Sequence, residues 1–155
     1  MRATVRTVLD APAERVWHEV RTTRLLRHVA GPILVFRPVD PPAFPERWPE
    51  GRHLVKLRAF GLLPLGSQWI VTSVSRPEDQ TAGTYRIRDA GSGTLVRVWD
   101  HRITISARGD GRADYRDDVD VEAGILTPFV WGFVHAFYRY RQWRWRRLIA
   151  RGFRY

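Results

Sequence analysis

Four ionisable side chains lie at positions that the sequence pattern turns toward the protein interior: Arg97, His101, Asp117 and Arg141. A buried charge is costly unless an opposite charge or hydrogen bonds compensate it, and Asp117 with Arg141 or Arg97 would be a natural pair. A histidine beside a carboxylate can act as a general base, because the carboxylate fixes its tautomer and favours its protonated form. The group therefore predicts one of three roles: mutual compensation in a polar part of the core, ligand anchoring, or proton transfer.

The spacing of the two strands around Gly109–Gly111 predicts that His101 and Asp117 lie close together. Both strands carry apolar residues at odd-numbered positions, so their apolar faces coincide only when odd positions pair with odd positions. A three-residue loop with Gly111 in the left-handed position gives this register. His101 then lies opposite Val119, and Asp117 is its diagonal neighbour at roughly 7–8 Å, a distance that the two side chains can bridge.

Arg141 belongs to a long helix predicted from Thr127 to Gly152. Thr127 can cap the first turn, Pro128 suits the first helical position, and Gly152 can end the helix in a left-handed conformation. One face of this helix carries an apolar stripe, because its residues recur at ~100° steps. The residues of the stripe are Val130, Phe133, Val134, Phe137, Trp145 and Leu148. Arg141 lies in the middle of this stripe, so it is predicted to face inward.

The preceding chain supplies a sheet for this helix to cover. Ala3 to Leu9 alternates as a strand, and two short helices follow, one capped by Asp10 and one from Thr22 to His28. Further strands are predicted at Ile33–Arg37, His53–Phe60, Ser67–Ser75, Thr81–Arg88, Thr94–Ala107 and Arg112–Ala123. Turns are predicted at 61–66, 76–79, 89–93 and 109–111, and strands joined by short turns pair antiparallel. Pro38 to Gly51, with five prolines, predicts a loop that can form a lid or rim.

Length and composition predict a single domain over residues 1–155, large enough to bury a core. The chain has no cysteine, which excludes a disulfide framework or a thiolate metal site and fits a reducing compartment. The N-terminus carries no signal-peptide pattern, and the most apolar window, Ile125 to Tyr138, is shorter than the ~20 residues of a membrane span. We therefore expect a cytoplasmic protein.

The net charge of +10 is concentrated at the C-terminal end, where seven arginines and no acid follow Ala123. All basic residues except Lys56 are arginine, which indicates a composition bias and favours a solvated helix face. Peripheral contact with an anionic membrane, or RNA binding, through this arginine-rich face is the alternative interpretation. Nucleic acid is not the expected partner, because Trp143 alone supplies the exposed aromatic surface that RNA platforms interleave with charge.

Five segments resemble the START-like or SRPBCC superfamily, and together they span nearly the whole chain. They are VLDAPAERVW at 8–17, LLPLG at 62–66, VWDHRITI at 98–105, YRDDVDVE at 115–122 and YRYRQWRWRRL at 138–148. Members of this superfamily include polyketide cyclases and aromatases, lipid-transfer domains and plant binders of hydrophobic ligands. The resemblance implies an α+β helix-grip fold: a curved antiparallel sheet of six to seven strands around a long C-terminal helix, with two short helices after the first strand.

The resemblance also implies a pocket between the sheet and the long helix. We expect it to bind a hydrophobic small molecule, such as a lipid, a quinone or a polyketide-like aromatic, without a cofactor. The expected pocket residues are Trp69, Tyr85, Arg97, Trp99, His101, Asp117, Phe133, Phe137 and Arg141.

The alternative is a cyclase- or dehydratase-like enzyme, with His101 as base, Asp117 orienting it, and Arg141 or Tyr85 polarising a carbonyl. The five histidines lack metal-ligand spacing, so no metal site is predicted. An exposed strand edge would permit a homodimer.

Overall fold

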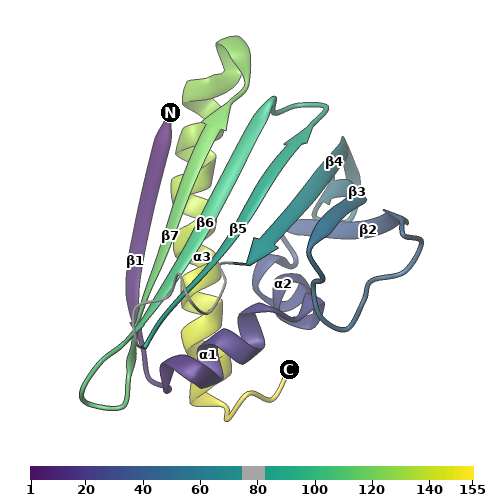
Figure 1. The fold of residues 1–155 in the computed structure, drawn as a ribbon. Helices are drawn as coiled ribbons and strands as arrows, with labels where there is room; N and C mark the ends of the chain where they lie inside the picture. The colour runs from purple at the N-terminus through teal and green to yellow at the C-terminus, as the bar shows by residue number, and fades with distance from the viewer. Residues whose placement is uncertain (75–82) are drawn as a thin grey trace.

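The computed structural model describes residues 1–74 and 83–155. Its elements are β1 (Arg2–Leu9), α1 (Ala13–Val20), α2 (Thr23–Ala30), β2 (Leu34–Asp40), β3 (Gly51–Ala59), β4 (Leu63–Val74), β5 (Thr84–Gly93), β6 (Val98–Ala107), β7 (Ala113–Glu122), the 3₁₀ turn η2 (Gly124–Leu126) and α3 (Thr127–Ala150). The chain thus runs from one strand through two short helices and six further strands to one long helix, as predicted (Figure 1).

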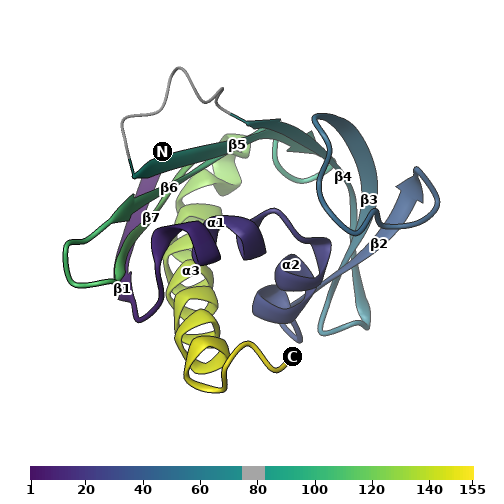
Figure 2. The same cartoon turned by 60° about the horizontal axis from the view of Figure 1, so that its bottom comes forward.

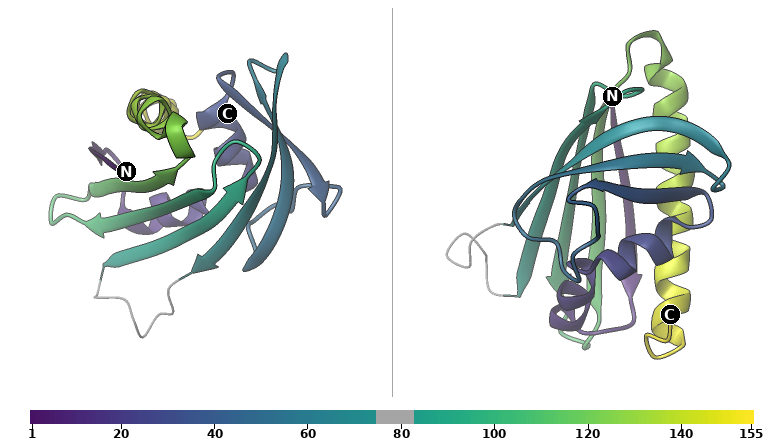
Figure 3. Two further views of the ribbon diagram at one scale, coloured as in Figure 1. Left: turned by 90° about the horizontal axis from the view of Figure 1, so that it is seen from above. Right: turned by 90° about the vertical axis from the view of Figure 1, so that its right-hand side faces the viewer.

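The strands form one antiparallel sheet in the order β1-β7-β6-β5-β4-β3-β2. Seen from above, the sheet is curved, with the strands at its β2 end bent toward the side on which α3 lies. The helix α3 is therefore on the concave side of the sheet (Figure 3). The short helices α1 and α2 cover the end of that side near the C-terminus (Figure 2). This arrangement confirms the predicted helix-grip fold.

The register of the β6–β7 hairpin is the predicted one. His101 pairs with Val119, and Ala107 pairs with Ala113 at the end of the hairpin. Gly111 has φ of 78°, the left-handed conformation that the loop requires. Odd-numbered residues of β6 and β7 therefore point to the concave face, and even-numbered residues point to the convex face.

The predicted turn at residues 89–93 is wrong, because this segment is the second half of β5. Its glycines instead allow a close approach of the neighbouring strand: a Cβ at Gly91 would lie 2.3 Å from the carbonyl oxygen of Trp69, and one at Gly93 would lie 2.7 Å from that of Ser67. The turn itself lies at residues 94–97, outside the two strands. The predicted turn at 76–79 lies outside the described residues.

Two predicted helix caps are also wrong. The N-cap of α3 is Leu126, and the hydroxyl of Thr127 donates to the carbonyl of Gly124 at 2.7 Å and accepts from the amide of Ala123 at 2.9 Å. Thr127 thus stabilises the preceding 3₁₀ turn. The N-cap of α1 is Pro12, without a side-chain cap bond, so Asp10 does not cap this helix.

The proline-rich segment is shorter than predicted, because β2 continues to Asp40. Trp48 from this segment is buried at 6% exposure and packs with Val55 and Ile70. Its backbone amide donates to the carbonyl of Arg21 at 2.8 Å, which holds the segment against the link between α1 and α2. The segment therefore contributes a buried side chain to the concave face.

The buried face of α3 differs in four positions from the predicted stripe, one of them Val130, which is half-buried. Val134, Phe137, Trp145 and Leu148 are buried as predicted, whereas Phe133 is 41% exposed. Two polar side chains join the buried set, namely Tyr138 at 1% and Gln142 at 4% exposure. Among the described residues, no helix has an apolar stretch of the length that crossing a membrane requires.

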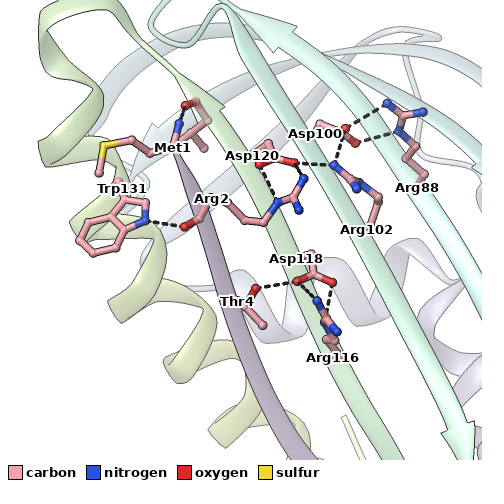
Figure 4. A network of polar contacts seen from close by, with 11 residues as sticks. Met1, Arg2, Thr4, Arg88, Asp100, Arg102, Arg116, Asp118, Asp120 and Trp131 are labelled. Carbon is pink, nitrogen blue, oxygen red and sulfur yellow. Dashed lines mark hydrogen bonds and ion pairs between the residues drawn. The ribbon is translucent and has the colours of Figure 1, made fainter.

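The convex face of the sheet carries a network of ion pairs (Figure 4). Arg88 donates to Asp100 at 2.8 and 3.0 Å, and Arg2 donates to Asp120 with two bonds of 2.9 Å. Arg102 lies between them and contacts both carboxylates. Each arginine of this network thus has a carboxylate partner from a neighbouring strand or from its own.

Candidate functional site

A cavity of about 220 Å³ lies between the concave face of the sheet, α2 and the first part of α3. A single buried water needs at least about 10–15 Å³ of such volume, so this cavity has room for an organic molecule. Its wall is mainly apolar and includes Phe36, Trp48, Ile87, Trp99, Phe133 and Phe137. The aromatic and aliphatic side chains thus leave an open space rather than closing it.

Three polar side chains cross this apolar wall in a row. Thr72 on β4 pairs with Asp89 on β5, and Asp89 pairs with His101 on β6. All three line the cavity, and Arg141 reaches the same cavity from α3. This row and Arg141 bring donors and acceptors from both the sheet and the helix into the cavity, and Ser67, Gln68, Arg88 and Thr94 also line it.

His101 and Asp117 form the predicted pair, with 2.8 Å between Nε2 and Oδ1. A carboxylate only accepts hydrogen bonds, so Nε2 carries a proton and Nδ1 is the acceptor in the neutral ring. Burial lowers the pKa of His101, the hydrogen bond that it donates to Asp117 opposes this change, and the positive charge of Arg141 lowers the pKa further. His101 is thus a neutral base at pH 7.

Asp117 lies behind His101 and is saturated by hydrogen bonds. The side-chain amide of Gln142 donates to its Oδ2 at 2.8 Å, and the hydroxyl of Tyr115 donates to its Oδ1 at 3.4 Å. Gln142 also donates to the carbonyl of Val5 at 3.0 Å, which ties α3 to β1. Asp117 therefore orients His101 and does not pair with Arg141 or Arg97, in contrast to the expected ion pair.

Asp89 is a site residue that the sequence pattern did not indicate, because it fell in a predicted turn. The β4–β5 ladder skips Ile70 and Val71, between the pairs Trp69–Ser92 and Thr72–Asp89. In this gap of the ladder, the backbone amide of Val71 donates a hydrogen bond to the carboxylate of Asp89 at 2.8 Å. Burial raises the pKa of Asp89 to about 7, against the opposing effects of this hydrogen bond and of Arg141.

Arg141 faces the cavity, as its position in the apolar stripe predicted. Its guanidinium carbon lies 4.7 Å from the ring centre of Tyr138 and 5.8 Å from that of Phe137, so two aromatic faces hold it. The ring of Tyr138 also meets His101 edge-on at 4.8 Å. Among the described residues, no carboxylate oxygen comes within 4.0 Å of the Arg141 guanidinium.

Four expected pocket residues do not line the cavity: Asp117, which lies behind His101, and three others that lie elsewhere. Arg97 lies in the turn before β6 and is exposed. Trp69 is on the convex face, where Arg52 covers its ring at 4.4 Å, because the inward positions of β4 at this level are even-numbered. Tyr85 points to the concave face below the cavity and stacks on Trp17 at 5.3 Å.

The open end of the cavity has apolar side chains. Leu95 and Phe133 line it and are 50% and 41% exposed. Phe129, one turn before Phe133, and Ile125, in the 3₁₀ turn η2, are 78% and 93% exposed. An apolar molecule that enters at this end would therefore leave water gradually, along an apolar surface.

Other predicted features are placed away from this cavity. On the arginine-rich face of α3, Arg147 lies 4.8 Å from the ring of Trp143, and Arg144 donates to the carbonyl of Gly31 at 3.1 Å. Within residues 1–74 and 83–155, no group of three or more histidine, cysteine, aspartate or glutamate side chains is arranged to hold a metal ion.

Solved structures share this fold at low sequence identity. A START superfamily protein from Mycobacterium smegmatis has a TM-score of 0.65 at 13% identity and covers 97% of each chain. A truncated norcoclaurine synthase from Thalictrum flavum has a TM-score of 0.57 at 8% identity, covering 91% of this chain and 90% of its own. The Zhui aromatase/cyclase from Streptomyces sp. R1128 has a TM-score of 0.53 at 10% identity, covering 95% and 89%.

No curated protein matches the chain in sequence. A family model described as Domain of unknown function (DUF8410) matches residues 7–151, which is most of the chain. The fold, shared with the START superfamily structure along nearly its whole length, is START-like. The chain therefore belongs to the DUF8410 family, with the START-like helix-grip fold as its architecture.

Proposed function

We propose that this protein binds a hydrophobic small molecule, such as a lipid, a quinone or a polyketide-like aromatic, in the cavity between the sheet and α3. The observation that carries the proposal is the open cavity of about 220 Å³, whose mainly apolar wall carries a row of polar side chains at Thr72, Asp89 and His101. Among the similar structures, one is named an aromatase/cyclase and another a norcoclaurine synthase, which supports the use of this fold for small organic molecules.

The residues proposed to bind the ligand fall into two groups. Trp99, Phe133 and Phe137 provide apolar surface, whose burial contributes roughly 25 cal/mol per Å². His101 and Arg141 provide hydrogen bonds that orient the polar end of the ligand. This division fits an amphipathic ligand better than a uniformly apolar one, because both polar groups would lose hydration without replacement.

Native mass spectrometry of the protein purified from cells tests this proposal, since a retained apolar molecule would add its mass. A titration with N-phenyl-1-naphthylamine, an uncharged dye that fluoresces in apolar sites, measures the capacity of the emptied cavity. We expect saturable binding of one dye per chain. Absence of both a retained molecule and dye binding would contradict the proposal.

A matched pair of valines locates the dye. Val96 lines the cavity, whereas Val98, two residues further on, is 39% exposed and does not. Val96→Trp should fill the cavity and weaken dye binding by about tenfold or more, and Val98→Trp should leave it unchanged. Equal binding by both variants would place the dye elsewhere on the protein.

The His101–Asp117 pair favours a second candidate function, a cyclase- or dehydratase-like enzyme. Nδ1 of neutral His101 can take a proton from the carbon next to a ligand carbonyl, and Arg141 can stabilise the enolate oxygen that results. Asp117 stabilises the imidazolium that forms. This candidate requires the same cavity and adds a chemical step to binding.

Proton exchange on a simple ketone separates the two candidates. For an enzyme, the protein in deuterated buffer should accelerate exchange at carbon 2 of α-tetralone, and His101→Gln should slow this exchange by about a hundredfold. The measurement is the loss of the proton signal in NMR. If α-tetralone binds while its exchange stays at the buffer rate, the protein is a binder without this chemistry.

A further inference from the structure

We infer that the ligand of this cavity is an amphipathic organic acid, whose carboxylate is bound by the guanidinium of Arg141 beside Asp89 and whose apolar chain runs toward the open end. This inference rests on the proposed binding function and specifies the class of ligand. It follows from the aromatic contacts of Arg141, from the partners already taken by the nearby acids, and from the position of the polar row along the cavity.

The guanidinium of Arg141 is held in place without being neutralised. The rings of Tyr138 and Phe137 contact it at 4.7 and 5.8 Å, and both rings are almost completely buried. No carboxylate among the described residues lies within ion-pair distance of it. A guanidinium presents parallel N–H donors that match the two oxygens of a carboxylate, so a ligand carboxylate supplies the missing charge and geometry.

Asp117 and Asp89, the acids on the inner side of β7 and β5, already accept hydrogen bonds from the protein. Asp117 accepts hydrogen bonds from His101, Gln142 and Tyr115, and it does not line the cavity. Asp89 lines the cavity, but one of its oxygens accepts the amide of Val71. Neither acid therefore replaces a ligand anion at the guanidinium.

Asp89 is suited to accommodate a second carboxylate. Thr72 on β4, His101 on β6 and Arg141 on α3 face it, and Asp100 acts on it from the other side of β6. The negative charge of Asp100 disfavours a negative charge on Asp89, and the positive charge of Arg141 favours it. A protonated Asp89 can donate its hydrogen to a carboxylate that Arg141 binds, so one proton is shared by two acids.

The position of the polar row sets the orientation of the ligand. Arg141 follows Phe133 by eight residues on α3, which is about 12 Å along the helix axis. Phe133 is at the open end of the cavity and partly exposed, whereas His101 in the polar row is 7% exposed. The carboxylate therefore lies at the inner end, and a chain of about ten carbons reaches the opening.

Competition between two ten-carbon compounds tests the inference. N-phenyl-1-naphthylamine occupies the cavity, and decanoate or 1-decanol displaces it; the two competitors differ in their charge. Charge-assisted hydrogen bonds predict that decanoate binds at least about tenfold more tightly than 1-decanol. Arg141→Met keeps the apolar stem and should abolish this preference, while Arg141→Lys should retain part of it.

Arg139→Met is the control, because Arg139 is exposed on the same helix and contacts His135. It should keep the full preference for decanoate. Equal affinities of the two competitors, or a preference for decanoate that survives in Arg141→Met, would overturn the inference. The proposed function would still stand in that case, because the dye binds in the cavity. If neither the dye nor decanoate binds, as confirmed by calorimetry, both the function and the inference fail.

The pH dependence of decanoate binding tests whether Asp89 shares its proton with the ligand carboxylate. Decanoate stays ionised from about pH 6 to pH 8, whereas Asp89 loses its proton in this range, so the affinity of the protein for decanoate should fall by several-fold. Asp89→Asn keeps a donor at every pH and should remove this fall. A pH dependence that persists in Asp89→Asn would show that Asp89 does not share the proton.

Discussion

The two faces of the sheet use the same residue types in opposite ways. On the convex face, Arg88, Arg102 and Arg2 each meet a carboxylate, so positive and negative charges compensate within the protein (Figure 4). On the concave face, Arg141 meets aromatic rings and an open cavity. A pair in water contributes little to stability, whereas a buried charge without a partner is costly.

We propose that this difference marks the polar groups that bind a ligand. The convex pairs join residues of neighbouring strands or, for Arg102 and Asp100, residues of one strand, and each pair brings opposite charges together. The concave row of Thr72, Asp89 and His101 has unused hydrogen-bonding capacity in an apolar setting, where a hydrogen bond to a ligand is stronger than in water. In the convex network each arginine has a carboxylate partner, whereas Arg141 on the concave side has none among the described residues, and this contrast is typical of a binding site.

The largest predicted effect comes from Asp117, the support of the concave site. Asp117→Leu removes the acceptor of His101 and Gln142, and leaves their buried donors without partners. We expect the free energy of unfolding to fall by about 3–5 kcal/mol. Urea denaturation measures this change; Asp117→Asn, which keeps one acceptor oxygen, should show a smaller loss. A loss below that of a convex-face variant would remove the distinction between the faces.

Asp89 gives a smaller effect that depends on pH. Its pKa of about 7 lies above that of an unfolded aspartate, so from about pH 4 to pH 7 the folded state keeps a proton that the unfolded state has lost. Stability therefore falls as pH rises through this range. Asp89→Asn has no buried carboxylate to ionise. Between about pH 5 and pH 8, its free energy of unfolding should therefore rise by about 1–3 kcal/mol relative to that of the unchanged protein.

Thermal or urea denaturation at several pH values provides this measurement, with the difference between the two proteins plotted against pH. A constant difference would mean that water in the cavity solvates Asp89 well enough to keep its ordinary pKa.

Asp100 on the convex face should give the smallest effect, with the opposite pH dependence. The hydrogen bond from Arg88 lowers the pKa of Asp100, so its stabilisation is present above the pKa of the unfolded aspartate and is lost as pH falls through the folded value. Asp100→Asn should cost less than about 1 kcal/mol at neutral pH, and added salt should reduce this cost. A larger, salt-independent loss would mean that the convex network is structurally as important as the concave one.

The sequence allowed the prediction of the His101–Asp117 pair because both contributing signals are local. Alternation of apolar residues determines which side chains share a face, and the loop at 109–111 determines the register. Arg141 was predictable for a similar reason, since a charge inside an apolar helical stripe must face the core or a cavity. The order of strands and helices, together with the family resemblance, was sufficient to predict the helix-grip fold.

The remaining site residues depend on contacts between strands that a single sequence does not encode locally. Asp89 lay beside glycines that are typical of turns, but these glycines serve a close approach between β4 and β5. The alternation on β4 did not show which face carries Trp69, because the pairing of β4 with β3 and β5 is not encoded locally. Whether the cavity is open depends on the packing of all its walls at once, which only the three-dimensional arrangement determines.

A crystal structure of the protein with decanoate tests the central claim most directly. The account predicts that the chain lies among Trp99, Phe133 and Phe137, and that the carboxylate lies within about 2.7–2.9 Å of the guanidinium of Arg141. A cavity closed by side chains, or a carboxylate at the opening with the chain pointing inward, would contradict the claim that the concave face keeps its uncompensated charge for a ligand.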